Sequence, residues 1–332
     1  MTLMSRIAPQ LIALAALVAL VSVFYPGFLS VDVQNDRLVG PVIDILKRSA
    51  PVALLAVGMT LVIATRGIDL SVGTIMAICG AAAAWALTAG LGAGAALALA
   101  LGAGLVAGLW NGVLVAVVGI QPFVATLILM TMGRGVAQLI TEGRILTFTD
   151  PGFSWLGSGT ALGLPVPVWI WLATAAAAAL LMRRTALGLL VEAVGINRRA
   201  ALLAGVYATV LLIAVYVVSG FCAALAGIIV TADIRGADAN NAGLWLELDA
   251  ILAVVIGGNS LLGGRFSIAA SVLGALIIQT ISAGILLAGF ASEYNLIIKA
   301  GLVLVILILQ SPRIASEWRL WRDSHRAQGD RA

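Results

Sequence analysis

Long, uninterrupted runs of alanine, leucine, valine and isoleucine recur along nearly the whole chain, and no polar segment is long enough to fold separately. Of the 332 residues, 62% are hydrophobic and only 10% are charged, and the mean hydropathy is +1.12. These values lie far outside the range of a soluble domain. The runs lack the alternating pattern of barrel strands, so the sequence predicts an all-α, polytopic membrane protein.

The apolar runs predict about ten transmembrane helices, near residues 7–28, 49–65, 71–90, 93–118, 122–140, 166–182, 206–230, 248–258, 266–288 and 294–310. Most of the 19 lysines and arginines fall at run ends that share one side of the membrane, which places both termini in the cytoplasm. We expect one transmembrane domain over residues 1–312 and a basic cytoplasmic tail over residues 313–332. The first run lacks a small-x-small cleavage site, so it is read as an uncleaved span.

Few groups are available for catalysis or metal binding. The chain has one histidine, His325, and two cysteines, Cys79 and Cys222, which fall inside apolar runs where a thiol usually fills space. We therefore expect no catalytic residue, no metal site and no cofactor. The formal charge of +4 marks the ends of spans and the tail, so it indicates topology and not a nucleic-acid surface.

Two of the predicted spans are too short to cross a bilayer. The second has about sixteen residues before "RGIDLSVG" and would be about 24 Å long, against roughly 30 Å of hydrocarbon. The eighth is about 16 Å long at the same rise and ends in the glycine-rich "GGNSLLGGR". Non-helical backbone at membrane depth is tolerated only against protein or a water-filled cavity. The interrupted second/third and eighth/ninth spans therefore indicate a translocation pathway.

Asp69 in the first interruption has two interpretations. In one, Asp69 or Ser71 caps the start of the third span, while Arg66 marks the cytoplasmic side. In the other, Asp69 is also a functional group of the pathway or its inner gate, held ionised by Arg66 or Arg134.

Several more polar groups lie in or beside the apolar runs. Arg134 and Lys299 would be costly against lipid, so each should face the bundle interior or a polar cavity, or form a structural ion pair. The other groups either join helices by hydrogen bonds or line the pathway, and they are Asn111, Gln121 and Thr126.

The outer segment "TADIRGADANNAGLWLELDAI" combines hydrogen-bonding side chains with an apolar ring. This mixture suits contact with a sugar at an outer gate, although a loop that only packs the gate or binds a partner would also carry it. Its candidate residues are Asp238, Asn240, Asn241, Trp245, Glu247 and Asp249.

The cytoplasmic segment "RRTALGLLVEAVGINRRAALLAGV" mixes helix formers with charges and is too apolar to stay free in solvent. It predicts a short helix that binds a partner or, alternatively, lies on anionic lipid. The candidate residues are Glu192, Asn197, Arg198 and Arg199.

Four stretches, "VGMTLVIATRGIDLSVG", "QPFVATLILMTMGRGVAQLITEG", "EAVGINRRAALLAGV" and "LELDAILAVVIGGNSLLGG", resemble the membrane permease subunits of bacterial sugar-importing ABC transporters of the ribose type. The resemblance covers nearly the entire chain in the same order. The outer segment is most similar to permeases of galactofuranose importers. Arg66 replaces a small residue that is usual in the glycine-aspartate motif of the ribose-type permeases, which changes the electrostatics around Asp69.

The resemblance implies a permease of the bacterial inner membrane, with a second permease chain, an ATP-binding cassette ATPase and a periplasmic sugar-binding protein as partners. It implies that the Glu192–Val206 segment contacts the ATPase and that a monosaccharide is the cargo. No G-x-x-x-x-G-K-[ST] motif occurs in the chain, so we expect no ATPase site of its own. A ribose importer and an ion-coupled secondary sugar carrier remain alternatives. The secondary carrier would need titratable groups along the pathway, of which Asp69 is the clear candidate.

Overall fold

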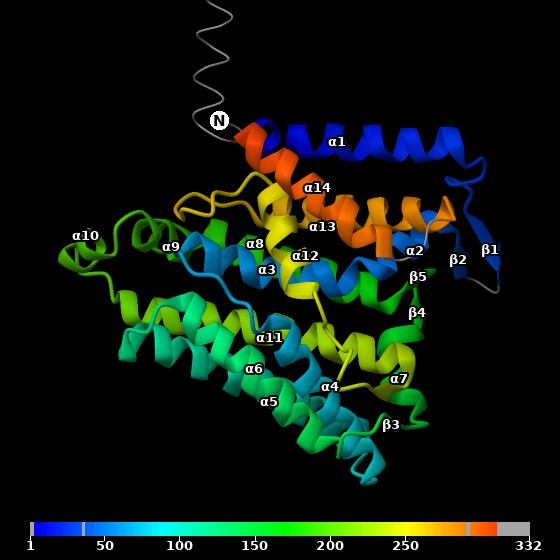
Figure 1. Cartoon of the computed structure of the whole chain (residues 1–332), viewed down its shortest axis with the longest axis horizontal. Coiled ribbons are helices and arrows are strands. Elements are labelled where there is room, and N and C mark those ends of the chain that lie inside the picture. Colours follow the sequence, from blue (N-terminus) through cyan, green and yellow to red (C-terminus); the bar gives the residue numbers. More distant parts are fainter. Residues whose placement is uncertain (1–2, 35–36, 290–292, 311–332) are drawn as a thin grey trace, which may run out of the picture. The chain divides into compact units, whose positions relative to one another are not determined.

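A computed structural model describes residues 3–34, 37–289 and 293–310, and it is helical nearly throughout (Figure 1). Each of the ten predicted segments contains a helix, so the all-α prediction is confirmed. These helices are α1 (Leu3–Phe24), α3 (Ala50–Ala64), α4 (Val72–Thr88), α5 (Gly92–Val113), α6 (Pro122–Ile140), α8 (Val166–Arg184), α11 (Ala208–Ile234), α12 (Leu246–Ile256), α13 (Ile268–Leu287) and α14 (Glu293–Gln310). The predicted tail at residues 313–332 lies outside the described residues.

Shorter elements occupy the connections between these helices. A π-helix, η1 (Leu114–Val118), extends α5, and four further helices are α2 (Pro41–Arg48), α7 (Pro151–Ser158), α9 (Leu187–Ile196) and α10 (Arg198–Leu203). Three antiparallel pairs of short strands are β1 (Asp32–Gln34) with β2 (Arg37–Val39), β3 (Leu146–Thr147) with β6 (Gly236–Ala237), and β4 (Thr160–Ala161) with β5 (Leu164–Pro165). In the second pair Leu146 lies opposite Ala237, which joins the connection after α6 to the outer segment.

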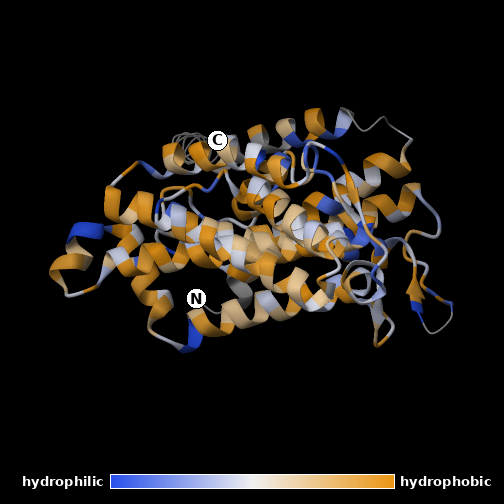
Figure 2. Ribbon diagram, turned by 90° about the horizontal axis from the view of Figure 1, so that it is seen from below, coloured by the Kyte–Doolittle hydropathy of each residue, from blue (hydrophilic) through white to orange (hydrophobic). Residues whose placement is uncertain are grey.

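Six helices in the described ranges are long and apolar enough to cross a membrane: α1, α5 with η1, α6, α8, α11 and α13. The pair α2 and α3, bent by 42° at Ser49, would make a seventh as one broken span. Hydrophobic residues cover these helices and hydrophilic ones gather at their ends and in the connections (Figure 2). The helices α4 and α12 are shorter, with 17 and 11 residues, and each adjoins an interruption.

The described residues form two units, divided between Thr280 and Ile281. In the first unit α3 is the central helix, because every one of its residues except Pro51 is buried. A helix that is apolar on all sides belongs in the interior of a bundle. Around it, most of α4 is buried and α5 and α11 are partly buried, whereas most residues of α1, α6 and α8 are not buried, as suits lipid-facing helices. The second unit contains α14, and there the Ser282 hydroxyl donates to Asn295.

Glycines on α5 allow its backbone to touch that of α11. A Cβ atom at Gly104 would lie 2.6 Å from the Gly220 carbonyl oxygen, and one at Gly108 would lie 2.5 Å from the Tyr216 carbonyl oxygen. Small residues four positions apart permit such close approach between membrane helices. The contact fixes the register of α5 against α11, and both helices supply polar side chains to the first interruption.

Candidate functional site

The first interruption, between α3 and α4, contains a fully buried hydrogen-bond network centred on Asp69. One carboxylate oxygen of Asp69 accepts from the Ser71 backbone N–H at 3.0 Å and the Ser71 hydroxyl at 2.6 Å. Its other oxygen accepts from the Ser219 hydroxyl of α11 at 2.8 Å. The Ser71 side chain makes no capping bond to α4, so Asp69, and not Ser71, satisfies a backbone donor at the start of this helix.

Two more predicted residues join the network from other helices. The Asn111 amide of α5 donates to the Ser71 hydroxyl oxygen at 2.8 Å. The Thr126 hydroxyl of α6 accepts from the Leu70 N–H at 3.2 Å and lies 3.1 Å from the Ile68 carbonyl oxygen. The structure therefore brings Asp69, Ser71, Asn111 and Thr126 together. It also adds Ser219, which sequence reasoning missed.

The prediction that Arg66 or Arg134 pairs with the Asp69 carboxylate is wrong: among the described residues, neither arginine forms an ion pair with it. The Arg66 guanidinium donates to the Ile196 carbonyl oxygen at 2.7 Å and, through Nε, to the Leu262 carbonyl oxygen at 2.9 Å. Arg134 donates to carbonyl oxygens of the outer segment. Serine donors, and not an arginine, therefore surround the Asp69 carboxylate.

The second interruption, between α12 and α13, carries a similar buried network around Asn259. Its side-chain oxygen accepts from the Ser267 N–H at 2.6 Å, and its amide donates to the Ser271 hydroxyl oxygen at 2.9 Å. The Thr60 hydroxyl of α3 lies 2.7 Å from the same Ser271 oxygen. As at Asp69, one buried side chain bonds a backbone donor just beyond the break.

Arg66 joins the two interruptions to each other. It adopts a left-handed backbone conformation, with φ of 63°, which is unfavourable for a residue with a side chain. From there it bonds Leu262 in the second interruption and Ile196 at the end of α9. The Gly264 N–H donates to the Ala64 carbonyl oxygen at 2.9 Å, which adds a backbone connection. One residue therefore links both interruptions to the cytoplasmic segment.

The outer segment is held against α4 and α6. Asp238 accepts from the N–H groups of Asn240 and Asn241 and from the Asn241 side-chain amide. The Asn241 amide bond above all, with these N–H groups and nearby Arg134, lowers the pKa of Asp238 below its ordinary value. Gln138 of α6 donates to Asn240 at 2.7 Å.

Arg134 is an anchor for this segment and forms no ion pair within 4 Å among the described residues. Its Nη1 donates to the carbonyl oxygens of Ala239 at 2.9 Å and Ala242 at 2.7 Å. The prediction that Arg134 forms a structural ion pair is therefore wrong for the described residues. Lys299, the other charge predicted inside a span, lies on α14 in the second unit.

The remaining outer candidates surround the start of α12. Trp245 precedes this helix, with φ of 67°, and is 51% exposed. Glu247 and Asp249 occupy its first turn, where carboxylates interact favourably with the helix dipole. Glu247 is buried, and a Cβ atom on Gly73 of α4 would lie 2.6 Å from its Oε2. Trp245 is thus the exposed aromatic group of this segment, and Leu244 and Leu248 are exposed as well.

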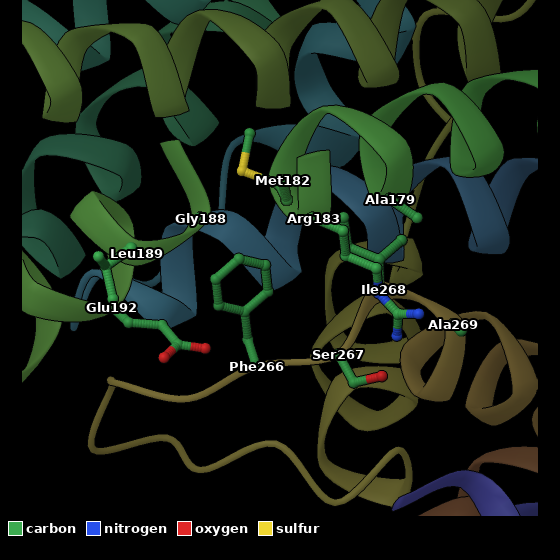
Figure 3. A pocket seen from close by; sticks show the side chains of 10 residues that line it. All are labelled: Ala179, Met182, Arg183, Gly188, Leu189, Glu192, Phe266, Ser267, Ile268 and Ala269. Carbon is green, nitrogen blue, oxygen red and sulfur yellow. The ribbon is translucent and has the colours of Figure 1, made fainter. Parts of the chain in front are cut away.

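The cytoplasmic segment forms two short helices, α9 and α10, where the sequence predicts one. Asn197 divides them, because its side chain accepts from the Ala200 N–H and caps α10. Glu192 lines a cavity of about 230 Å³ whose other walls come from the end of α8 and the start of α13 (Figure 3). In that view Glu192 and Arg183 lie on either side of Phe266.

The surface of this segment is strongly apolar beside its charges. Leu189 is 71% exposed and Leu203 is 91% exposed, while Arg198 and Arg199 follow the break between the helices. Arg198 donates back to the Ala116 carbonyl oxygen of η1 at 3.3 Å. Gln121 lies on the other side of η1, where it precedes Pro122 at the first position of α6.

Helices long enough to cross a membrane, two interruptions held by buried polar side chains and an exposed apolar surface on α9 and α10 define an integral membrane permease. A family model described as the permease component of a branched-chain amino acid transport system matches residues 42–307. The chain belongs to this family, whose members are multi-pass proteins of the bacterial inner membrane.

Curated relatives match the chain along nearly its whole length. The galactofuranose transporter permease protein YtfT of Escherichia coli (strain K12) is 61% identical, over 93% of this chain and 90% of that protein. The fructose import permease protein FruF of Bifidobacterium longum is 41% identical, over 94% and 89% respectively. The ribose import permease protein RbsC of Escherichia coli (strain K12) is 40% identical, over 92% and 93%. No solved structure matches the chain.

Proposed function

We propose that this chain is the membrane-spanning subunit of an ATP-driven importer and forms the pathway for a monosaccharide, galactofuranose. The observation that carries the proposal is the 61% identity to the galactofuranose permease, against 41% and 40% for the fructose and ribose permeases. The outer segment supports it with an exposed Trp245 beside Asn240 and Asn241, an apolar face next to hydrogen-bonding groups.

In the proposed architecture, ten spans cross the membrane within a single permease domain over residues 1–312, and both termini are cytoplasmic. The distribution of lysine and arginine supports this orientation. The segment with α9 and α10 then faces the cytoplasm, and the segment from Asp238 to Asp249 faces the periplasm.

The proposed partners are a second permease chain, an ATP-binding cassette ATPase and a periplasmic sugar-binding protein. The exposed leucines and arginines of α9 and α10 support contact with the ATPase, because an apolar centre with a charged rim is typical of such interfaces. ATP is then hydrolysed by that partner, and the binding protein supplies most of the sugar specificity.

Transport follows from a shift between inward-open and outward-open states, driven by ATP binding to the partner. Motion of α9 passes to the interruptions through Arg66, which bonds the last carbonyl of α9 and the second interruption. The networks around Asp69 and Asn259 hold the next helices as rigid bodies, so the breaks act as hinges.

Replacing Arg66 with glycine is expected to lower the sugar transported per ATP hydrolysed several-fold. Stability should change by less than about 1 kcal/mol, because relief of the left-handed conformation offsets the lost hydrogen bonds. Uptake and ATP turnover are measured together in proteoliposomes, with Arg66→Lys as the charge-retaining control. An unchanged ratio of uptake to ATP turnover would show that Arg66 has no coupling role.

Replacing Glu192 and Arg199 together with alanine is expected to leave the permease folded but weaken its binding to the ATPase about tenfold or more, as loss of charged interface contacts does. Co-purification and sugar-stimulated ATP turnover report the effect. Arg184→Ala, at the end of α8, is the control for a change of surface charge. Normal stimulation by the double variant would remove these residues from the interface.

The function itself is tested by expressing the chain in cells that lack their own permease and measuring sugar uptake. Restored galactofuranose uptake that needs the ATPase gene product and survives collapse of the proton gradient supports the proposal. Uptake that depends on the gradient alone would indicate a secondary carrier. Restored ribose uptake without galactofuranose uptake would keep the importer and replace the sugar.

A further inference from the structure

A cavity of about 250 Å³ lies at the end of the first unit where the α3–α4 interruption, η1, the start of α6 and the α9–α10 pair meet α11. The side chains that matter in its lining are Arg66, Gln121, Arg198 and Tyr216. A cavity of this size has room for a small polar ligand together with water. The cavity is separate from the buried Asp69 network and from the cavity beside Glu192.

Two positive charges at this cavity have no carboxylate partner among the described residues. In the part of the chain that the structure describes, the ion pairs are Lys47 with Asp233 and Arg144 with Glu142, and none of these four residues lines the cavity. Arg66 and Arg198 donate instead to neutral carbonyl groups, Arg66 to Ile196 and Leu262 and Arg198 to Ala116. Their hydrogen bonds anchor the guanidinium groups without neutralising them.

The hydroxyl of Tyr216 points independently to a ligand. Tyr216 is completely buried, lines the cavity, and its hydroxyl has no hydrogen-bond partner in the described chain. Gly67, which lines the same cavity, leaves room for this hydroxyl, because a Cβ atom there would lie 2.6 Å from it. A buried hydroxyl without a hydrogen-bond partner is unfavourable, so a ligand that pairs with it is stabilised. The nearby Asp69 carboxylate accepts from Ser71 and Ser219.

We propose that this cavity binds a phosphate group, held by Arg66 and Arg198 and by the hydroxyl of Tyr216. Guanidinium groups pair with phosphate oxygens through two parallel hydrogen bonds. A free phosphate compound carries about two negative charges near neutral pH and a lipid phosphodiester carries one, so either group offsets positive charge that no carboxylate balances here. The Gln121 amide, at the rim, supplies a further donor. The phosphate comes either from an anionic lipid headgroup or from a free phosphate compound. Binding does not depend on the sugar assigned above.

The test is the thermal stability of the purified permease in neutral detergent, titrated with inorganic phosphate and, at equal ionic strength, with chloride. Phosphate is expected to raise the melting temperature saturably, and Arg198→Gln should weaken the apparent affinity about tenfold, as loss of a charged hydrogen bond does. Arg199→Gln is the matched control and should respond as the parent does. An equal rise with chloride, or an unchanged response in Arg198→Gln, would overturn the site.

Tyr216→Phe separates binding from a structural role. Without phosphate this variant should be at least as stable as the parent, because it loses an unpaired buried hydroxyl, yet it should bind phosphate several-fold more weakly. Unchanged affinity in this variant contradicts the proposal even if Arg198→Gln fails to fold.

A second pair of titrations identifies the source of the phosphate group, in bilayer discs of phosphatidylcholine alone or with phosphatidylglycerol. If phosphatidylglycerol abolishes the response to added phosphate, a lipid headgroup occupies the cavity. If the response persists in both discs, the ligand is a free phosphate compound. Absence of any response in phosphatidylcholine discs overturns the site.

Discussion

Replacing Asp69 with alanine is expected to lower the stability of the permease by about 3 kcal/mol and to abolish uptake. The change leaves the Ser71 N–H and the hydroxyls of Ser71 and Ser219 without their common acceptor in a fully buried place. It also frees the start of α4 from α11. The melting temperature in detergent and sugar uptake in proteoliposomes measure the two effects.

Asp69→Asn is the matched variant, because its side-chain oxygen can still accept from Ser71. Stability should then fall by less than about 1 kcal/mol, while uptake still falls markedly if the charge takes part in transport. Normal uptake by Asp69→Asn would leave Asp69 with only its structural role at the start of α4. A fully stable Asp69→Ala would contradict the network itself.

Replacing Gly108 with valine is expected to destabilise the protein by about 3 kcal/mol or more, the upper range for an overpacked interior. A Cβ atom at Gly108 would lie 2.5 Å from the Tyr216 carbonyl oxygen and 2.9 Å from the Val217 Cα, and backbone atoms cannot move aside. The two helices would have to separate, which would disrupt the contact between Asn111 and Ser71 as well.

Gly102→Val is the control for this change. Gly102 lies on the same helix, and a Cβ atom there would meet no atom within 4 Å. This variant should change stability by less than about 0.5 kcal/mol, as surface substitutions usually do. If the two valine variants have equal yields and melting temperatures, close packing of α5 on α11 does not hold the fold together.

The ten helices could be predicted because each one coincides with a long apolar run in the sequence. The interruptions could be predicted because glycine and polar residues follow runs that are too short to cross a bilayer. The helices α2 and α7 could not, since each has only eight residues. The division of the cytoplasmic segment into two helices at Asn197 could not be predicted either, because it depends on a single capping hydrogen bond from the Ala200 N–H to the Asn197 side chain.

Most residues of the candidate site could be recognised from the sequence, but the residues with which each of them forms hydrogen bonds could not. Asp69, Asn111 and Thr126 stand out as polar groups in apolar surroundings, whereas Ser219 and Tyr216 resemble ordinary residues of an apolar helix. Arg66 was assigned the wrong partner because charge alone suggested Asp69. In the fold its nearest acceptors include a carbonyl at the end of α9, a group that helix ends leave unpaired.

The central claim, that the chain is the permease of an ATP-driven galactofuranose importer, is tested most directly by ATP hydrolysis in lipid. The permease is reconstituted with its candidate ATPase and binding protein, and galactofuranose, galactopyranose and ribose are added separately. We predict stimulation by galactofuranose alone. Failure of the chain to associate with the ATPase, or hydrolysis that no sugar stimulates, would contradict the claim.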